Sequence, residues 1–195
     1  SAYVRAVNKH VPDLIPCISE TRSPMHYTAE IAKNEDPDCI TVFIGPCIAK
    51  RREGMDDPMV DYVLSVEEIN ALFIAKKIDP SNIEITDDEI INKKNIPTAS
   101  GRNFAQSGGV YESIKARIAD PDILRPTVIN GLNKKGMAQL AMYGKINSGK
   151  LAQPVNCPNL VEVMACEGGC IAGPGVIANP NIAIGQLNKY VADGK

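Results

Sequence analysis

The sequence predicts an α/β fold in which a mostly parallel β-sheet is flanked by helices. Short apolar runs rich in β-branched residues alternate with segments of helical periodicity, which is the order of strand–helix units. The chain has 195 residues, of which 44% are hydrophobic, and this is enough to bury one core. No repeat or low-complexity tract divides the sequence. We therefore expect residues 1–195 to form a single domain.

The first strand is expected at 40–44, where a β-branched and aromatic run ends at a Gly-Pro pair. A shorter strand is expected at 62–64. Ser65 follows it directly, and a glutamate stands three residues after Ser65. This spacing is a capping box, which predicts a helix that runs to about Lys77.

The next segment, 79–102, is polar and is expected to be a surface excursion with one short helical turn at 89–91. Ser107 is then expected to cap a helix over 108–118, in which apolar residues recur at helical spacing.

The remaining elements are a strand and turn over 127–132, a helix over 135–146 and a last strand over 160–164. The last strand delivers Cys166 to a loop at its carboxyl end, as the first strand delivers Cys47. Open α/β sheets hold their ligands beyond the carboxyl ends of their strands. The two cysteine loops therefore predict one convergent site.

Composition excludes two classes of partner. The formal net charge is −2, and nucleic-acid binders usually concentrate positive charge. No apolar run reaches the roughly 20 residues that cross a bilayer, and no signal sequence opens the chain. We expect a cytoplasmic protein with no nucleic-acid partner and no membrane insertion.

Six cysteines are present in a chain longer and more apolar than most disulfide-stapled domains. Reduced thiols, some of them metal ligands, are the better interpretation. The cysteines are Cys17, Cys39, Cys47, Cys157, Cys166 and Cys170.

The stretch 166–170 reads Cys-Glu-Gly-Gly-Cys, with further glycines at 173 and 175. Paired glycines allow backbone N–H groups to approach an inorganic anion closely, and thiolates suit iron–sulfur clusters and zinc. A glycine-rich connection with two buried free cysteines is the alternative.

A second motif begins at Cys47. If a helix follows it, Lys50 and Glu53 share one face near the thiolate, where Lys50 could donate hydrogen bonds to an anionic ligand. The alternative is a solvated basic helix start beside a core cysteine.

The patch at 19–26 mixes hydroxyls and charges around a Ser-Pro step and is expected to be a loop with a helix start. We assign no ligand role to its histidine, His26, which is more typical of a surface or hydrogen-bonded histidine. Cys17 and Cys39 are expected to pack as small apolar side chains.

Taken together and in order, these motifs resemble the catalytic domain of the diiron (iron-only, FeFe) hydrogenases. That family has a Met-Pro-Cys-x-x-Lys-x-x-Glu stretch, a Thr-Gly-Gly-Val-Met-Glu-Ala stretch and a Glu-Val-Met-Ala-Cys-x-Gly-Gly-Cys stretch. The corresponding residues here are 45–53, 107–113 and 162–170. Residues 14–24 also look like the segment between the family's first two cysteine motifs.

The resemblance implies a role for each matching residue. Cys47 and Cys166 would ligate a four-iron, four-sulfur cubane, and Cys170 would bridge the cubane to a diiron subsite, which together form the H-cluster. Lys50 would hydrogen-bond a cyanide on the diiron unit. Met164 would pack beside the cubane. The other matching positions lie near the proton route or the cofactor, and they are Ser19, Ser23, Pro24 and Glu53.

The resemblance also implies that part of the domain is missing. The family's first motif supplies the fourth cubane ligand, and this chain begins about where that motif ends. We expect an inactive fragment without the amino-terminal lobe and without its cluster, and the exposed face predicts self-association. Expected partners are the missing lobe, an electron-transfer protein or ferredoxin-type domain, and a signalling domain.

Several positions depart from the family pattern. Gly45 replaces a methionine, Met25 replaces a common glutamine, and Ala172 and Pro174 change the glycine-rich tail. Such contacts tune a cluster's electronic properties. The variant loop looks more like a divergent, sensory branch of the family, in which the hydrogenase domain is joined to signalling modules.

Three functions remain open at this point. The first is a hydrogenase or hydrogen sensor that, at full length, interconverts protons, electrons and dihydrogen. The second is a non-enzymatic iron–sulfur protein similar to hydrogenase-like cluster-assembly factors. The third is a structural zinc site formed by the three motif cysteines and Cys157, although short Cys-x-x-Cys knuckles are absent.

Overall fold

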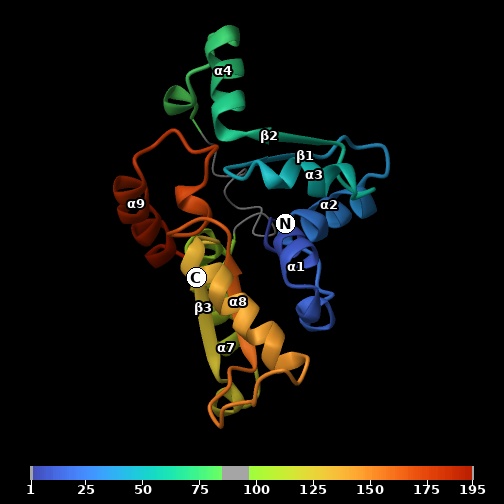
Figure 1. Cartoon of the computed structure of the whole chain (residues 1–195). Coiled ribbons are helices and arrows are strands. Elements are labelled where there is room, and N and C mark those ends of the chain that lie inside the picture. The colour runs from blue at the N-terminus through green and yellow to red at the C-terminus, as the bar shows by residue number, and fades with distance from the viewer. Residues whose placement is uncertain (1, 85–96, 195) are drawn as a thin grey trace.

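The computed structural model describes residues 2–84 and 97–194 and confirms the α/β class (Figure 1). The helical turn expected at 89–91 lies outside the described residues. The helices and strands are α1 (Ala2–His10), α2 (Pro24–Glu35), β1 (Val42–Gly45), α3 (Ala49–Met55), β2 (Tyr62–Ser65), α4 (Val66–Lys76), α6 (Ala99–Arg102), α7 (Gly109–Lys115), β3 (Pro126–Asn130), α8 (Lys134–Asn147), β4 (Leu160–Met164) and α9 (Pro180–Ala192). Short 3-10 turns are η1 (Pro12–Cys17), η2 (Pro80–Asn82), η4 (Asn103–Ala105), η5 (Pro121–Ile123) and η6 (Cys170–Ala172).

The described strands pair in parallel, as expected, but they form two sheets of two strands each. β1 pairs with β2, with Val42 opposite Tyr62, and β3 pairs with β4, with Ile129 opposite Val163. Periodicity identifies a strand but carries no information about which strand it will pair with. The division into two sheets was therefore not predictable from the local pattern.

Each sheet has its own apolar core. Around β3 and β4, the buried residues Val7, Val11, Ile129 and Leu140 bring α1, the start of η1 and α8 onto the sheet. Around β1 and β2, the buried residues are Met25, Ala29 and Val60, and they pack with Phe43, Met59 and Val63. Figure 1 shows the two sheets in different parts of the molecule, with α1 and α2 connecting the two regions.

The capping box at the start of α4 is confirmed. The Glu68 backbone N–H donates to the Ser65 hydroxyl at 3.1 Å, and the Ser65 backbone N–H donates to the Glu68 carboxylate at 2.8 Å. The helix ends at Lys76, and Lys77 adopts a left-handed conformation with φ 56°. Two satisfied backbone donors at the first turn and a left-handed residue after the last turn fix both ends of α4.

The expected cap of α7 is wrong. Gly108, with φ 93°, occupies the N-cap position, and no side-chain hydrogen bond comes from the cap residue. The Ser107 hydroxyl is buried without a hydrogen-bond partner in the described structure. The helix is also shorter than expected, ending at Lys115. At the start of the helix, a carboxylate from the strand β4, Glu162, accepts from the N–H groups of Gly108 and Tyr111 and so takes the place of the expected cap.

The first strand begins two residues later than expected. Thr41 precedes β1, and its hydroxyl donates to the Met59 carbonyl at 2.7 Å, while its backbone N–H donates to Asp61 at 2.8 Å. The Thr41 carbonyl also accepts from the Tyr62 N–H at 3.0 Å, and the strand proper begins at Val42. None of the helices in the described part of the chain is both long and apolar enough to cross a bilayer.

Candidate metal centre

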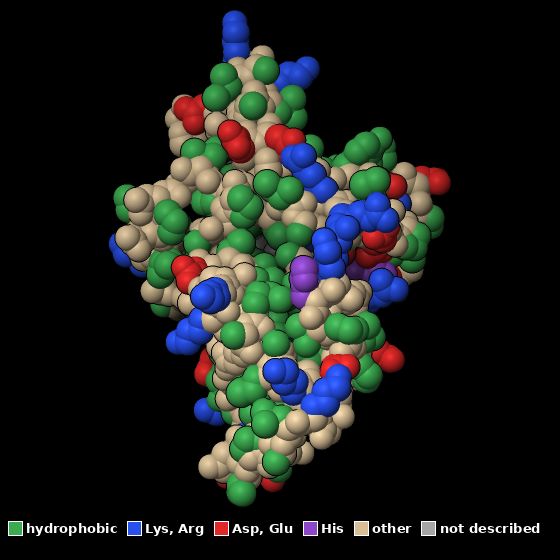
Figure 2. Space-filling model, in the orientation of Figure 1, with side chains coloured by type: hydrophobic (Ala, Val, Ile, Leu, Met, Phe, Trp, Pro, Cys, Tyr) green, Lys and Arg blue, Asp and Glu red, His purple; other side chains and the backbone are tan. Residues whose placement is uncertain are grey.

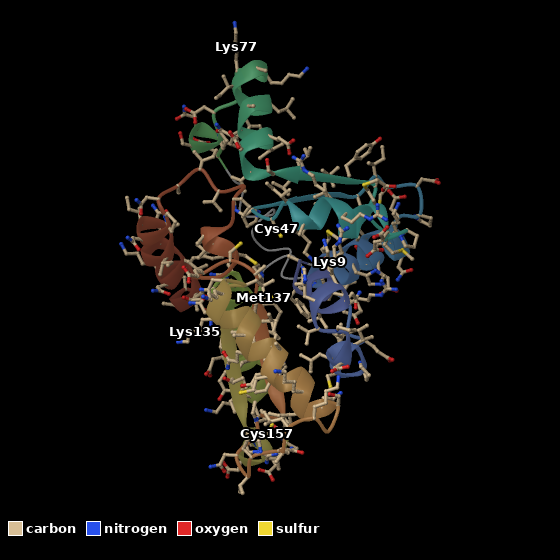
Figure 3. All side chains as sticks on the ribbon, in the orientation of Figure 1. Lys9, Cys47, Lys77, Lys135, Met137 and Cys157 are labelled. Atoms are coloured by element: carbon tan, nitrogen blue, oxygen red, sulfur yellow. The ribbon has the colours of Figure 1, made fainter. Side chains whose placement is uncertain are left out.

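Cys47 lies directly beyond the carboxyl end of β1, in the middle of the molecule (Figure 3). The residue before it, Pro46, touches the segment that follows Cys170. The Gly175 backbone N–H donates to the Pro46 carbonyl at 2.9 Å. A Cβ placed on Gly173 would lie 2.6 Å from the same oxygen, so only glycine fits there without a shift. One backbone contact thus joins two cysteine loops that are more than a hundred residues apart in the sequence.

The 166–170 loop is held on a second side by the turn after β3. The backbone N–H of Gly131 donates to the Met164 carbonyl at 3.0 Å, and the N–H of Leu132 donates to the Ala165 carbonyl at 3.1 Å. The Gly168 N–H donates to the Asn130 side-chain oxygen at 2.8 Å. These bonds extend the β3–β4 pairing beyond the strands and carry it into the cysteine loop.

Two glycines in this loop adopt backbone conformations that other residues avoid. Gly168 has φ 84° and Gly169 has φ 92°. A Cβ on Gly169 would lie 2.6 Å from the Ser107 backbone nitrogen and 2.8 Å from the Ala105 carbonyl oxygen. The paired glycines are therefore required both for the turn and for the close approach of the 105–107 backbone.

The Cys47 thiolate lies close enough to Cys166 and Cys170 to affect the ionisation of both. Burial raises the pKa of Cys166, and the negative charge of Cys47 raises it further. Burial also raises the pKa of Cys170, and both other thiols add to the rise, while Lys50 opposes it. The structure thus brings the three predicted cysteines into one electrostatic neighbourhood, with Lys50 as a nearby positive charge.

Lys50 and Glu53 form a close ion pair on the helix that follows Cys47. The Lys50 Nζ donates to Glu53 Oε1 at 2.6 Å, and both side chains are largely buried. Burial has the largest single effect on Glu53 and raises its pKa, but the hydrogen bond and positive charge of Lys50 and the Ser23 hydroxyl act together in the other direction, and the pKa falls to about 2. The predicted common face of Lys50 and Glu53 is present, whereas Arg51 and Arg52 in the same helix are exposed to solvent.

The other predicted site residues differ in their exposure and in their hydrogen bonds. Met164 is buried at the end of β4, two residues before Cys166. Ser23 is the N-cap residue of α2 and is half-buried. Ser19 and Pro24 are exposed, and the Ser19 hydroxyl accepts a local hydrogen bond from the Thr21 N–H at 3.2 Å. No hydrogen bond among the described residues connects Ser19 or Pro24 to the cysteine loops.

Cys157 does not join this group. Figure 3 shows it at one end of the molecule, away from Cys47 in the middle, and it is buried there, with its carbonyl accepting from the Arg125 side chain at 3.0 Å. His26 is a satisfied histidine, as expected, because its Nδ1 lies 2.8 Å from a carboxylate oxygen of the buried Asp57. A site that combined Cys157 with the other three cysteines would need a different fold.

Sequence reasoning missed Glu162. This carboxylate is buried on β4 and accepts hydrogen bonds from the backbone N–H groups of Gly108 and Tyr111, both at 2.8 Å. It performs the capping that was expected of Ser107. The available signal was an acidic residue in the middle of the apolar run 160–164, where a buried charge needs partners.

The donor set fits an iron–sulfur cluster. Such a cluster needs thiolate ligands and a loop that leaves room for it. The structure offers three thiols beyond two strand ends, a lysine beside them, and a glycine loop that keeps side chains away. Within residues 2–84 and 97–194, no three histidine, cysteine or acidic side chains gather tightly enough to hold a single metal ion. A cubane takes its cysteines one to each iron, so its ligands stand farther apart than those of one ion.

Comparisons with known proteins agree with this donor set. The sequence matches the family described as "Iron only hydrogenase large subunit, C-terminal domain" over residues 1–174. It is 23% identical to iron hydrogenase 1 of Clostridium pasteurianum, covering 96% of this chain and 38% of that protein. It is 25% identical to the periplasmic Fe hydrogenase large subunit of Nitratidesulfovibrio vulgaris, covering 89% of this chain and 49% of that protein.

The fold is also similar to solved structures. A structure of the FeFe hydrogenase HydA(deltaEFG) superposes with a TM-score of 0.62 at 20% identity, covering 97% of this chain and 63% of that one. The chain therefore spans less than half the length of the two curated relatives and about two thirds of the solved domain. On the extent of the family match, this chain belongs to the iron-only hydrogenase large subunit, C-terminal domain family.

Proposed function

We propose that this chain is the part of an iron-only hydrogenase that supplies three cysteine ligands to an H-cluster, and that the whole protein interconverts protons, electrons and dihydrogen. The observation that supports this best is the contact of Pro46 with Gly173 and Gly175, which places the Cys47 loop against the Cys170 loop. The activity belongs to the whole protein, because the chain spans only part of its relatives.

Each cysteine has a proposed role. Cys47 and Cys166 bind iron atoms of the cubane, and Cys170 is the bridge to the diiron subsite. When bound, the H-cluster supplies the redox chemistry and the site at which hydrogen is made or split. Met164, buried at the end of β4, shields the cubane side of the site from water.

Lys50 is the proposed donor to an anionic ligand of the diiron unit. Its ammonium group has three N–H donors, of which Glu53 accepts one. Glu53 fixes the direction of the lysine side chain and remains charged at neutral pH, because its pKa is about 2. A buried lysine beside three thiols is suited to hydrogen-bond an anionic diiron unit. It therefore favours a hydrogenase over a cluster-assembly factor without hydrogen chemistry.

The remaining assignments rest on the resemblance. Ser23 contributes to the Glu53 environment, while Pro24 and the exposed Ser19 keep their proposed places near the cofactor and the proton route. The proposed partners are an amino-terminal lobe with the fourth cubane ligand, an electron-transfer protein or ferredoxin-type domain, and a signalling domain if the protein senses hydrogen. We propose a cytoplasmic location for the whole protein.

The test is anaerobic reconstitution of the whole parent protein with iron and sulfide, followed by maturation with the diiron unit. We expect iron and acid-labile sulfide close to the cubane stoichiometry, a reduced-cubane signal in electron paramagnetic resonance, and infrared bands from carbonyl and cyanide. Cys47→Ser and Cys166→Ser should lose most of the cubane signal, since each removes one thiolate ligand. Cys170→Ser should lose the infrared bands.

Cys17→Ser is the matched control, because Cys17 is an exposed cysteine of η1. It should reconstitute like the unmodified protein. The proposal would be abandoned if the unmodified protein bound no cluster, or if all four serine variants retained the same iron content and spectra.

A further inference from the structure

Glu162 is an unusual residue for its position. It lies in the middle of β4, it is 8% exposed, and the residues on either side are valines. Both carboxylate oxygens are used: Oε1 accepts from the Gly108 N–H and Oε2 accepts from the Tyr111 N–H, each at 2.8 Å. No ion pair involving Glu162 is found among the described residues.

Packing alone does not explain this carboxylate. Burial of an acidic side chain is unfavourable unless hydrogen bonds compensate, and an apolar residue would fill the same space without that cost. The two bonds connect β4 with the first turn of α7, residues 54 and 51 positions away in the sequence. A charged acceptor also complements the positive end of the helix backbone. The carboxylate therefore fixes one segment of backbone relative to another.

The segment that Glu162 holds runs over residues 103–111, and it is folded tightly on itself. A Cβ on Gly109 would lie 1.9 Å from the Asn103 carbonyl oxygen, so the two backbones are in direct contact. The Gln106 carbonyl accepts from the Gly109 N–H at 3.2 Å. The 103–111 segment is therefore closely packed on itself, and Glu162 is bonded to its Gly108 and Tyr111 N–H groups.

The same segment presses on the cysteine loop. The Ser107 N–H donates to the Gly168 carbonyl at 3.3 Å. Gly169 lies against the backbone of 105–107 with no room for a side chain. β4 thus reaches the loop in two ways: through the chain itself, which continues to Cys166, and through Glu162 and the 103–111 segment, which packs on Gly168 and Gly169.

We propose that Glu162 is a positioning residue that holds the 103–111 segment against β4 and thereby fixes the 166–170 loop in the conformation that presents Cys166 and Cys170 to the cluster. The cluster part of this inference rests on the proposed function. The clamp on the loop does not, because it concerns contacts of the chain itself.

The test uses Glu162→Gln in the whole parent protein. The amide keeps the shape of the side chain but offers one acceptor oxygen, and its NH₂ group would face a backbone donor. Glu112→Gln is the matched control, since Glu112 lies on the same helix α7, is exposed, and undergoes the same chemical change. Hydrogen exchange is measured first without the cluster.

We expect Glu162→Gln to speed amide exchange in 105–111 and 166–170 by roughly tenfold or more, as for loss of a hydrogen bond to a charged group. The rest of the chain and the Glu112→Gln variant should exchange as the unmodified protein does. After reconstitution, Glu162→Gln should shift the g values of the cubane that is bound, which a general loss of stability would leave unchanged.

Exchange that is unchanged in both segments, or that rises evenly over the whole chain with unaltered cluster spectra, would overturn the inference. If Glu162→Gln does not fold, Glu162→Asp serves instead, because the shorter carboxylate cannot reach both N–H groups in the present geometry; exchange equal to the unmodified protein's in both segments would again overturn it. If the unmodified protein binds no cluster, the proposed function fails, whereas the exchange experiment still decides whether Glu162 holds the loop.

Discussion

Near the cysteine loops, the carboxyl group of Glu53 has a pKa far from the ordinary value of a glutamate. Its carboxylate accepts a 2.6 Å hydrogen bond from Lys50, and its pKa falls from 4.5 to about 2. The same negative charge, after burial, helps to raise the pKa of the Tyr3 hydroxyl on α1. Glu53 therefore links the helix after Cys47 electrostatically to the amino-terminal helix.

Glu53 gives a prediction about acid stability. Because its folded-state pKa is lowered, the pair stabilises the folded protein above about pH 4.5, and this contribution disappears as the pH falls toward 2. Since the Glu53 side chain is still 21% exposed, solvent screening reduces the effect to about 1 kcal/mol. Urea unfolding at several pH values should show this loss in the unmodified protein.

The variant Glu53→Gln should be less stable by that amount at pH 7 and should approach the unmodified protein near pH 2. Arg52→Gln is a useful comparison, because Arg52 and Asp56 form an exposed pair on the same helix. It should change the stability by less than about 0.5 kcal/mol. Equal pH profiles for the unmodified protein and Glu53→Gln would contradict the prediction.

At the scale of loops and helices, the packing of the cysteine loops depends on glycines where two backbones are in contact. Gly173→Ala should destabilise the protein by about 1–3 kcal/mol, because the new methyl group would lie 2.6 Å from the Pro46 carbonyl oxygen and 2.9 Å from that of Cys170. Thermal unfolding of the chain measures the change. The 170–175 segment and the Cys47 loop should also separate, which hydrogen exchange at Gly175 would detect.

Gly185→Ala is the matched control in helix α9. A Cβ at this position meets nothing within 4 Å, and alanine is the better helix former. This variant should be more stable by about 0.5–1 kcal/mol. A Gly173→Ala variant as stable as Gly185→Ala would show that the Pro46 contact is not tight.

The capping box gives a prediction for α4. Ser65→Ala removes the acceptor for the Glu68 N–H and should cost about 1 kcal/mol, with faster amide exchange in the first turn of the helix. Glu67→Gln changes an exposed neighbour on the same turn and should cost less than about 0.5 kcal/mol. Equal exchange in Ser65→Ala and the unmodified protein would contradict the role of the cap.

In the whole molecule, the β1–β2 sheet has one covered face and one open face. Phe43 and Val63 pack toward α2 on the covered face. On the other face, Val42 and Ile44 are 46% and 47% exposed, and Tyr62, the partner of Val42, is 61% exposed. Ile40, just before the strand, is 70% exposed. Parallel sheets are normally covered on both faces, so this apolar face favours association.

We expect the chain by itself to self-associate, with a molar mass in light scattering that rises with concentration. Ile44→Lys should reduce this association, because it places a charge in the middle of the open face. Val155→Lys makes the same kind of change at an isolated residue that is 98% exposed and should leave the association unchanged. If both variants behaved alike, or if the chain remained monomeric throughout, this expectation would be wrong.

Charged side chains, unlike these apolar residues, do not gather by sign on the face seen in Figure 2. Figure 2 shows acidic and basic side chains interspersed over the face in view, in keeping with the small net charge. Several of them pair across elements, as Arg51 on α3 does with Glu68 on α4 at 2.5 Å and Lys150 with Asp13 on η1 at 2.8 Å. These exposed pairs contribute little stability each.

Much of the fold was predictable because it depends on neighbours in the sequence. The strand over 160–164 has the expected limits, and the helix that begins after Ser65 has the expected cap and nearly the expected end. Spacing over three or four residues determines such elements. The cap of α7 was not predictable in this way, because its acceptor, Glu162, lies 54 positions from Gly108.

The sequence by itself determined the α/β class, the order of the elements, and the two cysteine loops with Lys50 and Glu53, because each of these is a local pattern of residue types. Only the tertiary structure decided that the strands divide into two sheets, that Pro46 lies against Gly175, and that Glu162 holds the segment packed on Gly168 and Gly169. These features depend on which distant backbones come within hydrogen-bonding distance, and local periodicity does not encode that choice.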